Sequence, residues 1–163
     1  MSEIKSTESV GLRVQRELHA TPEEVFDAYT DPAKQRSWLS ALGPDGGAVE
    51  TSVDLRVGGA WEARFRPNPE TEVHDVQTYA EIDRPRRLVT DLVAESTIGG
   101  QRMPVLETRI VMTFEPTGGG TLVTVEQTGF PATEMRDFFA NVAWPGGLAR
   151  LDTFLAGEPQ RTD

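Results

Sequence analysis

Residues 49–65, VETSVDLRVGGAWEARF, contain the clearest structural signal in the chain. Apolar and polar residues alternate on both sides of Gly58-Gly59. Alternation with a period of two is typical of a strand with one buried face, and two glycines between such strands favour a tight turn. The stretch therefore predicts a β-hairpin with strands over 49–57 and 61–65. Its predicted buried face consists of Val49, Thr51, Val53, Leu55, Val57, Trp61, Ala63 and Phe65.

The same alternation continues towards the C-terminus. Further strands are predicted at about 73–83, at 87–95, through Ile110, Met112 and Phe114, and at 121–128. In the first of these strands, we place Val76, Ala80 and Ile82 on the buried face. Turns rich in glycine and proline, with no intervening helix, separate the strands. This arrangement indicates an antiparallel meander.

Towards the N-terminus, residues 10–20 also alternate and predict a first strand. Two short helices are expected to follow it, because Thr21-Pro22-Glu23-Glu24 has the pattern of a capping box and Asp31-Pro32 ends one helix and begins another. Within the strand, Arg16 lies among the apolar residues. A buried guanidinium needs a carboxylate, a ligand anion or a water-filled cavity, unless its stem packs inside and its head reaches solvent at the sheet edge.

The last long element is a helix predicted over 131–156. Trp144-Pro145-Gly146-Gly147 predicts a kink or break near Pro145, because proline lacks a hydrogen-bond donor and glycine weakens a helix. A sheet with one apolar face needs a cover, and this helix is long enough to provide it. The expected fold is therefore α+β, with a curved antiparallel sheet of six to seven strands around a long, kinked C-terminal helix and two short helices after the first strand.

Length and composition limit the function classes. The chain has 163 residues, which fit one domain over 10–156 with disordered segments at 1–9 and 157–163. A net charge of −10 disfavours binding to nucleic acid or to a membrane surface. There are no cysteines, only two histidines and no phosphate-binding motif, so neither a metal nor a cofactor is expected. Without a secretory signal or a long apolar run, we expect a cytoplasmic protein.

Several motifs follow one another along the chain in a recognisable order. They are Arg16–Phe26, Thr30-Asp31-Pro32 with Trp38, Val57–Trp61, Glu81–Val89, Gly118–Thr121, and Trp144 with Leu148 and Leu151. Over residues 10–156 the chain resembles the activator of Hsp90 ATPase homologue-like domain of the START-related, Bet v 1-like (SRPBCC) superfamily. The resemblance implies the helix-grip fold. It does not select a function, because the superfamily includes lipid carriers, cyclases, resistance proteins and co-chaperone domains. The eukaryotic co-chaperone contacts Hsp90 mainly through a separate N-terminal domain, so Hsp90 is not expected to be a partner of this chain.

A curved sheet around a helix tends to leave a concave space, and such spaces take small apolar ligands. We therefore hypothesise a cavity between the sheet and the C-terminal helix that binds a small, largely apolar molecule, with aromatic and polycyclic molecules among the candidates. Three tryptophans from different elements offer flat surfaces to such a ligand, although ordinary core packing would give the same pattern. The candidate ligand-binding residues are Arg16, Trp38, Trp61, Phe65, Met112, Phe138, Phe139 and Trp144.

Two other functions remain open. One is a cyclase-like or hydrolase-like enzyme in the same cavity, with Arg16 orienting an oxygen anion and His74 or Asp91 moving a proton. The simpler interpretation puts His74 at a strand end near solvent and Asp91 among the many surface acids. The other function is a protein-interaction domain, which would need an exposed apolar patch. The sequence does not distinguish a monomer from a homodimer.

Overall fold

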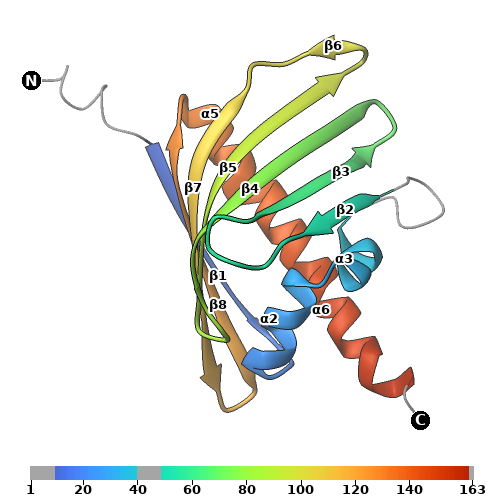
Figure 1. Ribbon diagram of the computed structural model, residues 1–163, viewed down its shortest axis with the longest axis vertical. Helices are drawn as coiled ribbons and strands as arrows, with labels where there is room; N and C mark the ends of the chain where they lie inside the picture. Colours follow the sequence, from blue (N-terminus) through green and yellow to red (C-terminus); the bar gives the residue numbers. More distant parts are fainter. Residues whose placement is uncertain (1–9, 40–48, 162–163) are drawn as a thin grey trace, which may run out of the picture.

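The computed structural model describes residues 10–39 and 49–161 (Figure 1). The predicted disordered segment 1–9, the predicted loop at 43–47 and residues 162–163 lie outside the described residues. In chain order the elements are β1 (Val10–Leu18), α2 (Pro22–Thr30), α3 (Pro32–Trp38), β2 (Glu50–Val53), β3 (Ala60–Asn68), β4 (Thr71–Asp83), β5 (Arg87–Ile98), β6 (Gln101–Arg102), β7 (Leu106–Thr117), β8 (Gly120–Phe130), α5 (Thr133–Phe138), η1 (Phe139–Ala143) and α6 (Trp144–Arg161).

The strands form one antiparallel sheet, as the hairpin signals predict. Its order is β1-β8-β7-β5-β4-β3-β2, and the two-residue strand β6 pairs with β5. β6 is the strand that brings the sheet to eight, compared with the predicted six to seven. The sheet, the two short early helices and the long C-terminal helix confirm the α+β helix-grip fold (Figure 1). We call the side of the sheet that faces α2 and α6 the inner face.

The two early helices begin as predicted. Thr21 and Glu24 form the capping box, in which the Glu24 amide donates to Thr21 Oγ1 over 3.2 Å and the Thr21 amide donates to Glu24 Oε1 over 2.9 Å. Asp31 then ends α2 and caps α3, because its carboxylate accepts from the Ala33 amide over 2.9 Å. These caps satisfy amides that have no partner within a helix.

The predicted strand over 49–57 is too long, because β2 ends at Val53. The chain then turns back on itself, with the Asp54 amide donating to the Ala60 carbonyl over 3.0 Å. The turn is tight at Gly59, where a Cβ atom would clash with the Asp54 carbonyl oxygen. Leu55 and Val57 are therefore exposed turn residues despite their alternation with polar neighbours.

The predicted buried face of β4 is wrong for its first half. The register between β4 and β5 shifts between Tyr79 and Glu81, which is the signature of a β-bulge. Before the bulge, the odd-numbered residues of β4 pair with inner-face residues of β3 and β5, so Val76 and His74 lie on the outer face. After the bulge, Ile82 faces inwards beside Leu88, as predicted. One extra residue exchanges the two faces of a strand, because side chains alternate with a period of two.

The predicted interruption near Pro145 takes the form of a π-helical turn. α5, η1 and α6 follow one another without a gap, and η1 ends directly before Trp144 and Pro145. Proline has no N–H to donate to the carbonyl four residues earlier, and its ring clashes with that carbonyl. A wider π-helical turn moves the carbonyl away from the ring and does not require the missing hydrogen bond. The helix then continues to Arg161, beyond the predicted domain boundary at 156.

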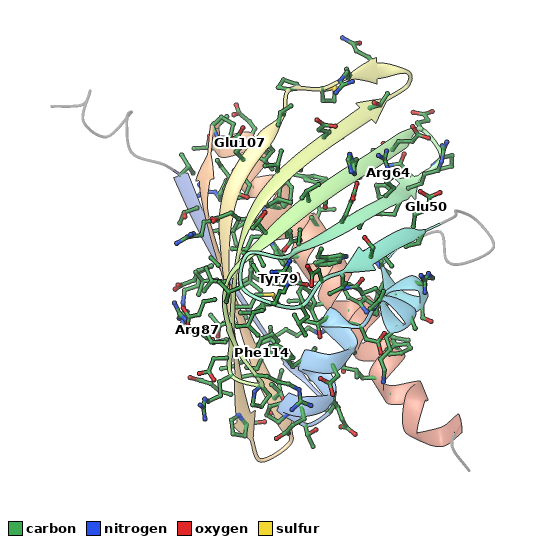
Figure 2. The ribbon with its side chains drawn as sticks, in the orientation of Figure 1. Glu50, Arg64, Tyr79, Arg87, Glu107 and Phe114 are labelled. Atoms are coloured by element: carbon green, nitrogen blue, oxygen red, sulfur yellow. The ribbon has the colours of Figure 1, made fainter. Side chains whose placement is uncertain are left out.

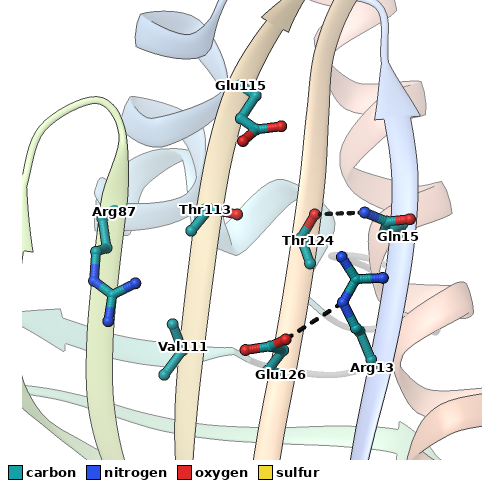
Figure 3. A pocket seen from close by; sticks show the side chains of 8 residues that line it. All are labelled: Arg13, Gln15, Arg87, Val111, Thr113, Glu115, Thr124 and Glu126. Atoms are coloured by element: carbon teal, nitrogen blue, oxygen red, sulfur yellow. Dashed lines mark hydrogen bonds and ion pairs between the residues drawn. The ribbon is translucent and has the colours of Figure 1, made fainter.

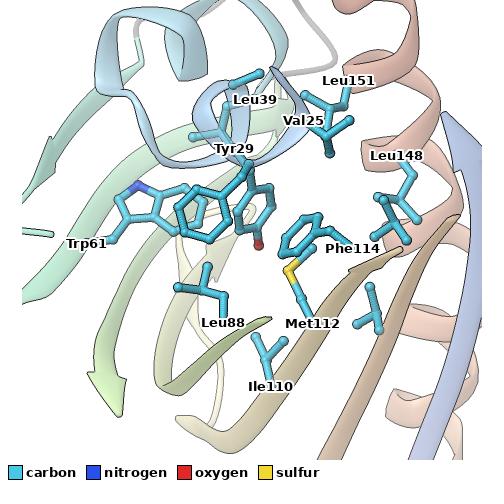
Figure 4. Packing of buried hydrophobic residues seen from close by; sticks show 14 of the residues in the cluster. Val25, Tyr29, Leu39, Trp61, Leu88, Ile110, Met112, Phe114, Leu148 and Leu151 are labelled. Carbon is cyan, nitrogen blue, oxygen red and sulfur yellow. The ribbon is translucent and has the colours of Figure 1, made fainter. Parts of the chain in front are cut away.

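The core lies where α2, α3 and α6 pack against the sheet (Figure 4). Phe26 of α2 meets Phe114 of β7 edge to face, with ring centroids 5.5 Å apart. From α6, Leu148, Leu151 and Leu155 are buried in the same cluster. This packing fixes α2 and α6 over one part of the inner face.

Candidate functional site

The C-terminal helix covers the inner face unevenly. It packs against β1 and β8 at one edge of the sheet and against α2 and α3. The ends of β3, β4 and β5 near their connecting turns extend past the helix (Figure 1). Along this part of the inner face the sheet residues Phe65, Val73, Ala94 and Ser96 are only half-buried. It is the part of the inner face that remains accessible to solvent.

Asp75 lies in the middle of this accessible surface. In the sheet register it is opposite Ala63 of β3 and Ala94 of β5. The alanine side chains opposite Asp75 on both neighbouring strands cannot hydrogen-bond the carboxylate. Its Oδ1 atom is buried and has no hydrogen-bond partner. A buried polar atom without a partner is uncommon in native proteins, so this oxygen requires an explanation.

The environment of Asp75 changes its protonation. Burial raises the pKa of the carboxyl from 3.8 to about 7, and the neighbouring His74 offsets part of that rise. Among the described residues, no arginine or lysine forms an ion pair with Asp75. A carboxyl in this state can donate a proton when neutral and attract a cation when ionised.

A polar group from α2 reaches the same region. Tyr29 interacts electrostatically with Asp75 and Tyr79, and Gln77 hydrogen-bonds its side chain. Gln77 in turn accepts from Thr90 Oγ1 over 2.8 Å. Burial raises the pKa of both tyrosine hydroxyls, so they remain protonated. The Tyr79 hydroxyl is buried without a partner. Two orphan polar atoms therefore lie on the inner face of β4 (Figure 2 labels Tyr79).

A second polar group fixes the C-terminal helix to the sheet. Trp144 Nε1 donates to Gln127 Oε1 over 2.7 Å, and Gln127 Nε2 donates to Thr108 Oγ1 over 2.8 Å. Gln127 is fully buried. Trp144 is half-buried and borders the packed core, so this predicted ligand-binding residue also positions the helix.

The other predicted tryptophans have structural contacts. Trp38 stacks on Tyr29 with ring centroids 5.6 Å apart and donates to the Ala28 carbonyl over 2.9 Å. Trp61 meets Tyr29 edge to face and donates to Thr51 Oγ1 over 2.8 Å. Trp61 also lies on β3 two residues from Ala63, the residue opposite Asp75. Both tryptophans are buried members of the core cluster, and Trp61 is the one that lies near Asp75 in the sheet register.

The predicted phenylalanines and methionine are dispersed. Phe65 lies on β3 two residues from Ala63, on the other side from Trp61, and is half-buried. Met112 is fully buried in the core. Phe139 is half-buried and packs on Phe130 with ring centroids 5.3 Å apart, whereas Phe138 is 54% exposed. Of these four residues, the sheet register brings Phe65 beside Asp75.

Arg16 lies on the inner parity of β1, as predicted, and its partner is a carboxylate. Its Nη2 atom is 3.5 Å from Asp152 Oδ2 of α6. The side chain is 42% exposed, so the guanidinium lies at the edge between β1 and α6. The same Asp152 carboxylate accepts from the His19 amide over 3.2 Å. Arg16 thus joins the helix to the edge strand and does not face Asp75.

His74 and Asp91 lie on the outer face, so neither faces the space in which the enzyme hypothesis placed them. His74 Nε2 is 2.7 Å from Glu62 Oε2. Asp91 forms a two-pronged ion pair with Arg109, at 2.7 and 2.9 Å, which lowers the pKa of the Asp91 carboxyl. The bulge in β4 explains the misplacement of His74.

Two depressions lie on the sheet, one on the outer face and one around the ends of the strands, where inner-face residues Phe65, Val73 and Ser96 line it together with outer-face residues. One, of about 180 Å³, is lined by polar and charged side chains of β1, β5, β7 and β8 (Figure 3). The other, of about 450 Å³, is lined by residues of β2 to β6, including His74. Their charges are largely paired, as between Arg13 and Glu126 at 3.3 Å. Neither depression corresponds to the predicted cavity between sheet and helix.

Four polar residues of this region were not predicted from the sequence, namely Asp75, Gln77, Tyr79 and Tyr29. The first three share one parity of β4, but the apolar residues Val76, Ala80 and Ile82 point to the opposite parity. A polar residue every second position in a central strand was the available signal. It could not be interpreted without the bulge, which only the pairing with β5 reveals.

Comparison with solved structures supports this fold. Protein NE0264 from Nitrosomonas europaea has a TM-score of 0.73 at 20% identity, with 93% of this chain and 97% of that chain covered. CV1439 from Chromobacterium violaceum gives 0.67 at 23% identity, covering 88% and 96%. Mll3558 from Rhizobium loti gives 0.65 at 26% identity, covering 90% and 96%. The protein is therefore a helix-grip protein.

The family follows from the sequence itself. Residues 19–156 match the model of the family described as Activator of Hsp90 ATPase homolog 1-like protein, and the chain belongs to that family. Among curated proteins, no sequence matches the chain at a significant level. None of the helices in the described part of the chain combines the length and apolar character needed to cross a membrane.

Proposed function

We propose that the protein binds a small, largely apolar molecule on the accessible inner face around Asp75. The observation that carries this proposal is a buried carboxylate oxygen without a partner on a surface of half-buried apolar side chains. Ligand sites typically combine an apolar lining with a few polar groups that orient the ligand. This surface has both components.

The apolar component comes from two sides. Phe65, Val73 and Ala94 lie on the sheet, and Phe139 and Trp144 lie on the C-terminal helix. All five are half-buried and still in contact with water. A ligand that covers them would gain roughly 25 cal/mol for each Å² of apolar surface removed from water. Burial of this surface would supply most of the binding free energy.

The polar component would determine how the ligand is oriented. Asp75 offers an unpartnered oxygen, whereas the unpartnered Tyr79 hydroxyl belongs to a fully buried side chain of the core. Leaving such groups unsatisfied costs about 1–3 kcal/mol each, and a ligand with a matching group would recover part of that cost. Protein side chains satisfy the other polar groups of this region, such as Gln77 and Thr90.

A dye-binding experiment tests this proposal. The neutral apolar dye N-phenyl-1-naphthylamine should bind the wild-type protein with increased fluorescence. Ala94→Leu places a larger side chain next to Asp75 and should weaken dye binding at least tenfold by occupying the ligand's space. Val93→Leu is the matched control, because Val93 is the adjacent residue on the outer face. Equal dye binding by A94L, V93L and the wild-type protein would contradict the proposal, provided that thermal unfolding shows both variants to be folded.

The same carboxyl supports a second candidate function, an enzyme that uses acid–base chemistry on a small apolar substrate. A carboxyl whose pKa lies at about 7 can both accept and donate a proton near neutral pH. In this enzyme Asp75 would take the role first assigned to His74 or Asp91. Native mass spectrometry of the protein from its own source distinguishes the two functions. A retained, unchanged molecule indicates binding, whereas conversion of that molecule by the wild type but not by Asp75→Asn indicates catalysis.

A further inference from the structure

We propose that the inner-face site recognises a ligand with a protonated amine on an apolar or aromatic body, and that the Asp75 carboxylate pairs with the ammonium group. This inference rests on the proposed function and specifies its ligand class. It comes from three features of the site, namely the charges of the inner face, the aromatic rings around Asp75 and the chemistry of the carboxyl.

The inner face has very few charges. Along the paired segments of the described strands, the register places Asp75 and Arg16 there as the only charged residues. Arg16 pairs with Asp152 at the β1 edge. Asp75 is therefore the one carboxylate along these paired segments of the inner face, and Arg16 at the β1 edge does not compensate it.

Arg136 and Arg150 of the C-terminal helix have other partners. Arg136 of α5 donates to the Gly11 carbonyl over 2.8 Å and pairs with Asp137. Arg150 of α6 donates to the Trp38 carbonyl over 3.0 Å and also contacts the Leu39 carbonyl. The remaining titratable groups near Asp75 are Tyr29 and Tyr79 on the inner side, and His74 behind it on the outer face. A positive charge for the Asp75 carboxylate would thus have to come from the ligand.

Aromatic rings flank the carboxylate. Trp61 and Phe65 lie on β3 at the positions diagonal to Asp75, which in an antiparallel pair are roughly 7–8 Å away. Tyr29 lies close enough to Asp75 to interact with it electrostatically. An ammonium group is attracted to the faces of aromatic rings as well as to a carboxylate. A carboxylate between aromatic rings therefore suits a cation with an apolar body.

The protonation states are compatible with this pairing. An alkylamine titrates near pH 10, as the lysine side chain does. Asp75 has a pKa of about 7, so above that pH the carboxylate and the ammonium are both charged. A neutral ligand that accepts a hydrogen bond from protonated Asp75 would show the opposite dependence and bind better below pH 7. The direction of the pH dependence therefore distinguishes the two ligand classes.

Two probes that differ only in charge test the inference. 4-Phenylbutylamine and 4-phenylbutan-1-ol share one apolar body, and each would be titrated against protein loaded with N-phenyl-1-naphthylamine. At pH 8 the dissociation constant of the amine, measured by displacement of the dye, should be about tenfold lower than that of the alcohol or lower still. The reason is that charge-assisted hydrogen bonds are stronger than neutral ones. At pH 5.5 that preference should largely disappear, as Asp75 becomes protonated.

Asp75→Asn should remove the preference for the amine at pH 8 and keep the affinity for the alcohol. The matched control is Asp91→Asn, which removes the same charge from the outer face and should keep the preference. This control separates local pairing from the general attraction of cations to a chain with a net charge of −10.

The possible failures are distinguishable. If dye and alcohol bind but the amine binds no better, or if Asp75→Asn keeps the preference, the inference is overturned and the proposed function stands. A preference that grows as the pH falls also overturns the inference. If neither the dye nor either probe binds, the proposed function itself fails. The pH dependence of the wild-type protein decides the matter even if Asp75→Asn does not fold.

Discussion

Asp75 shows how a single residue can be costly for folding and useful for binding. Its folded pKa of about 7 lies above the value of 3.8 for an unperturbed aspartate, because burial disfavours the charged form. Ala63 and Ala94 on the neighbouring strands bring no polar group to compensate it. We interpret this uncompensated carboxyl as stability given up for ligand recognition.

This interpretation predicts a specific dependence of stability on pH. Between about pH 4 and pH 7 the folded protein holds a proton on Asp75 that the unfolded chain has released, so the free energy of unfolding falls as the pH rises. The free energy of unfolding of the Asp75→Asn variant should not fall in this pH range. The variant should therefore be more stable than the wild type by about 1–3 kcal/mol at pH 8 and no more stable at pH 4. Urea denaturation at the two pH values measures the difference.

Asp91→Asn is the control for that experiment. Arg109 lowers the pKa of Asp91, so the contribution of Asp91 to stability is present at neutral pH and is lost as the pH falls. Removing Asp91 should therefore not stabilise the protein at pH 8. A gain for D91N equal to that of D75N would show that the effect comes from net charge and not from the inner face.

Among the elements, the C-terminal helix depends on a buried polar chain as well as on apolar packing. Trp144 donates to Gln127, and Gln127 donates to Thr108, which joins the helix to β8 and β7. The contact lies directly after the π-helical turn η1, where the helix is adjusted to Pro145. The chain therefore fixes the position of the helix at the border between the core and the accessible surface.

Gln127→Ala should destabilise the protein by about 2–4 kcal/mol, because it leaves the Trp144 indole N–H without its acceptor inside the protein. Hydrogen exchange of the η1 amides should also become faster. Thr124→Ala is the matched control on the same strand, since Thr124 accepts from Gln15 on the outer face. A loss of less than 0.5 kcal/mol for Q127A, by the urea measurement, would contradict this role of Gln127.

Gly146 and Gly147 begin α6 and give the helix local freedom next to the proposed site. A Cβ atom at either position would meet only the guanidinium of Arg150, at 3.4 and 3.9 Å, so alanine fits. The double change to alanine should stabilise the helix by about 1–2 kcal/mol and slow release of the bound dye. Gly157→Ala, further along the same helix, is the control for helix propensity alone. Unchanged dye-release rates in stopped-flow experiments would show that the freedom of the helix at Gly146 and Gly147 does not control release.

In the whole molecule, core packing and the proposed binding site occupy different parts of one inner face. The rows around Phe114, Met112 and Val125 are fully buried under α2 and α6. Phe65 of β3 and Asp75 of β4 are only half-buried, and the ends of these strands near their connecting turn extend past the helix (Figure 1). Changes in one part should thus affect stability, and changes in the other should affect binding.

Phe114→Ala tests this division. Removal of a fully buried ring that contacts Phe26 should cost about 3–5 kcal/mol. Val111→Ala, on the outer face of the same strand, should cost less than about 1 kcal/mol and is the control. Under conditions where F114A is still folded, its affinity for the dye should equal that of wild type. A matching loss of dye affinity would show that core and site are not separate.

Several local features were accessible from the sequence because they depend on neighbouring residues. The capping box at Thr21 and Glu24 agrees with the structure. A carboxylate was one of the expected partners of Arg16, and the structure places Asp152 beside it. The hairpin at Gly58-Gly59 was also correct, but its strand was too long. The turn length depends on where Tyr79 of β4 accepts from the Gly58 amide, which is a contact between distant residues.

The antiparallel meander from β2 to β8 could be predicted from the sequence, because alternation and turns are short-range properties. The resemblance of the ordered motifs implied the helix-grip architecture and the family. The pairing of β1 with β8 was not predicted, because it joins the two ends of the chain. The location of the site could not. A bulge in β4 is a property of its pairing with β5, and it turns Asp75 inwards and His74 outwards. A carboxylate becomes buried without a partner only when the strands and helices pack together. For this physical reason, Asp75 could be identified only from the tertiary structure.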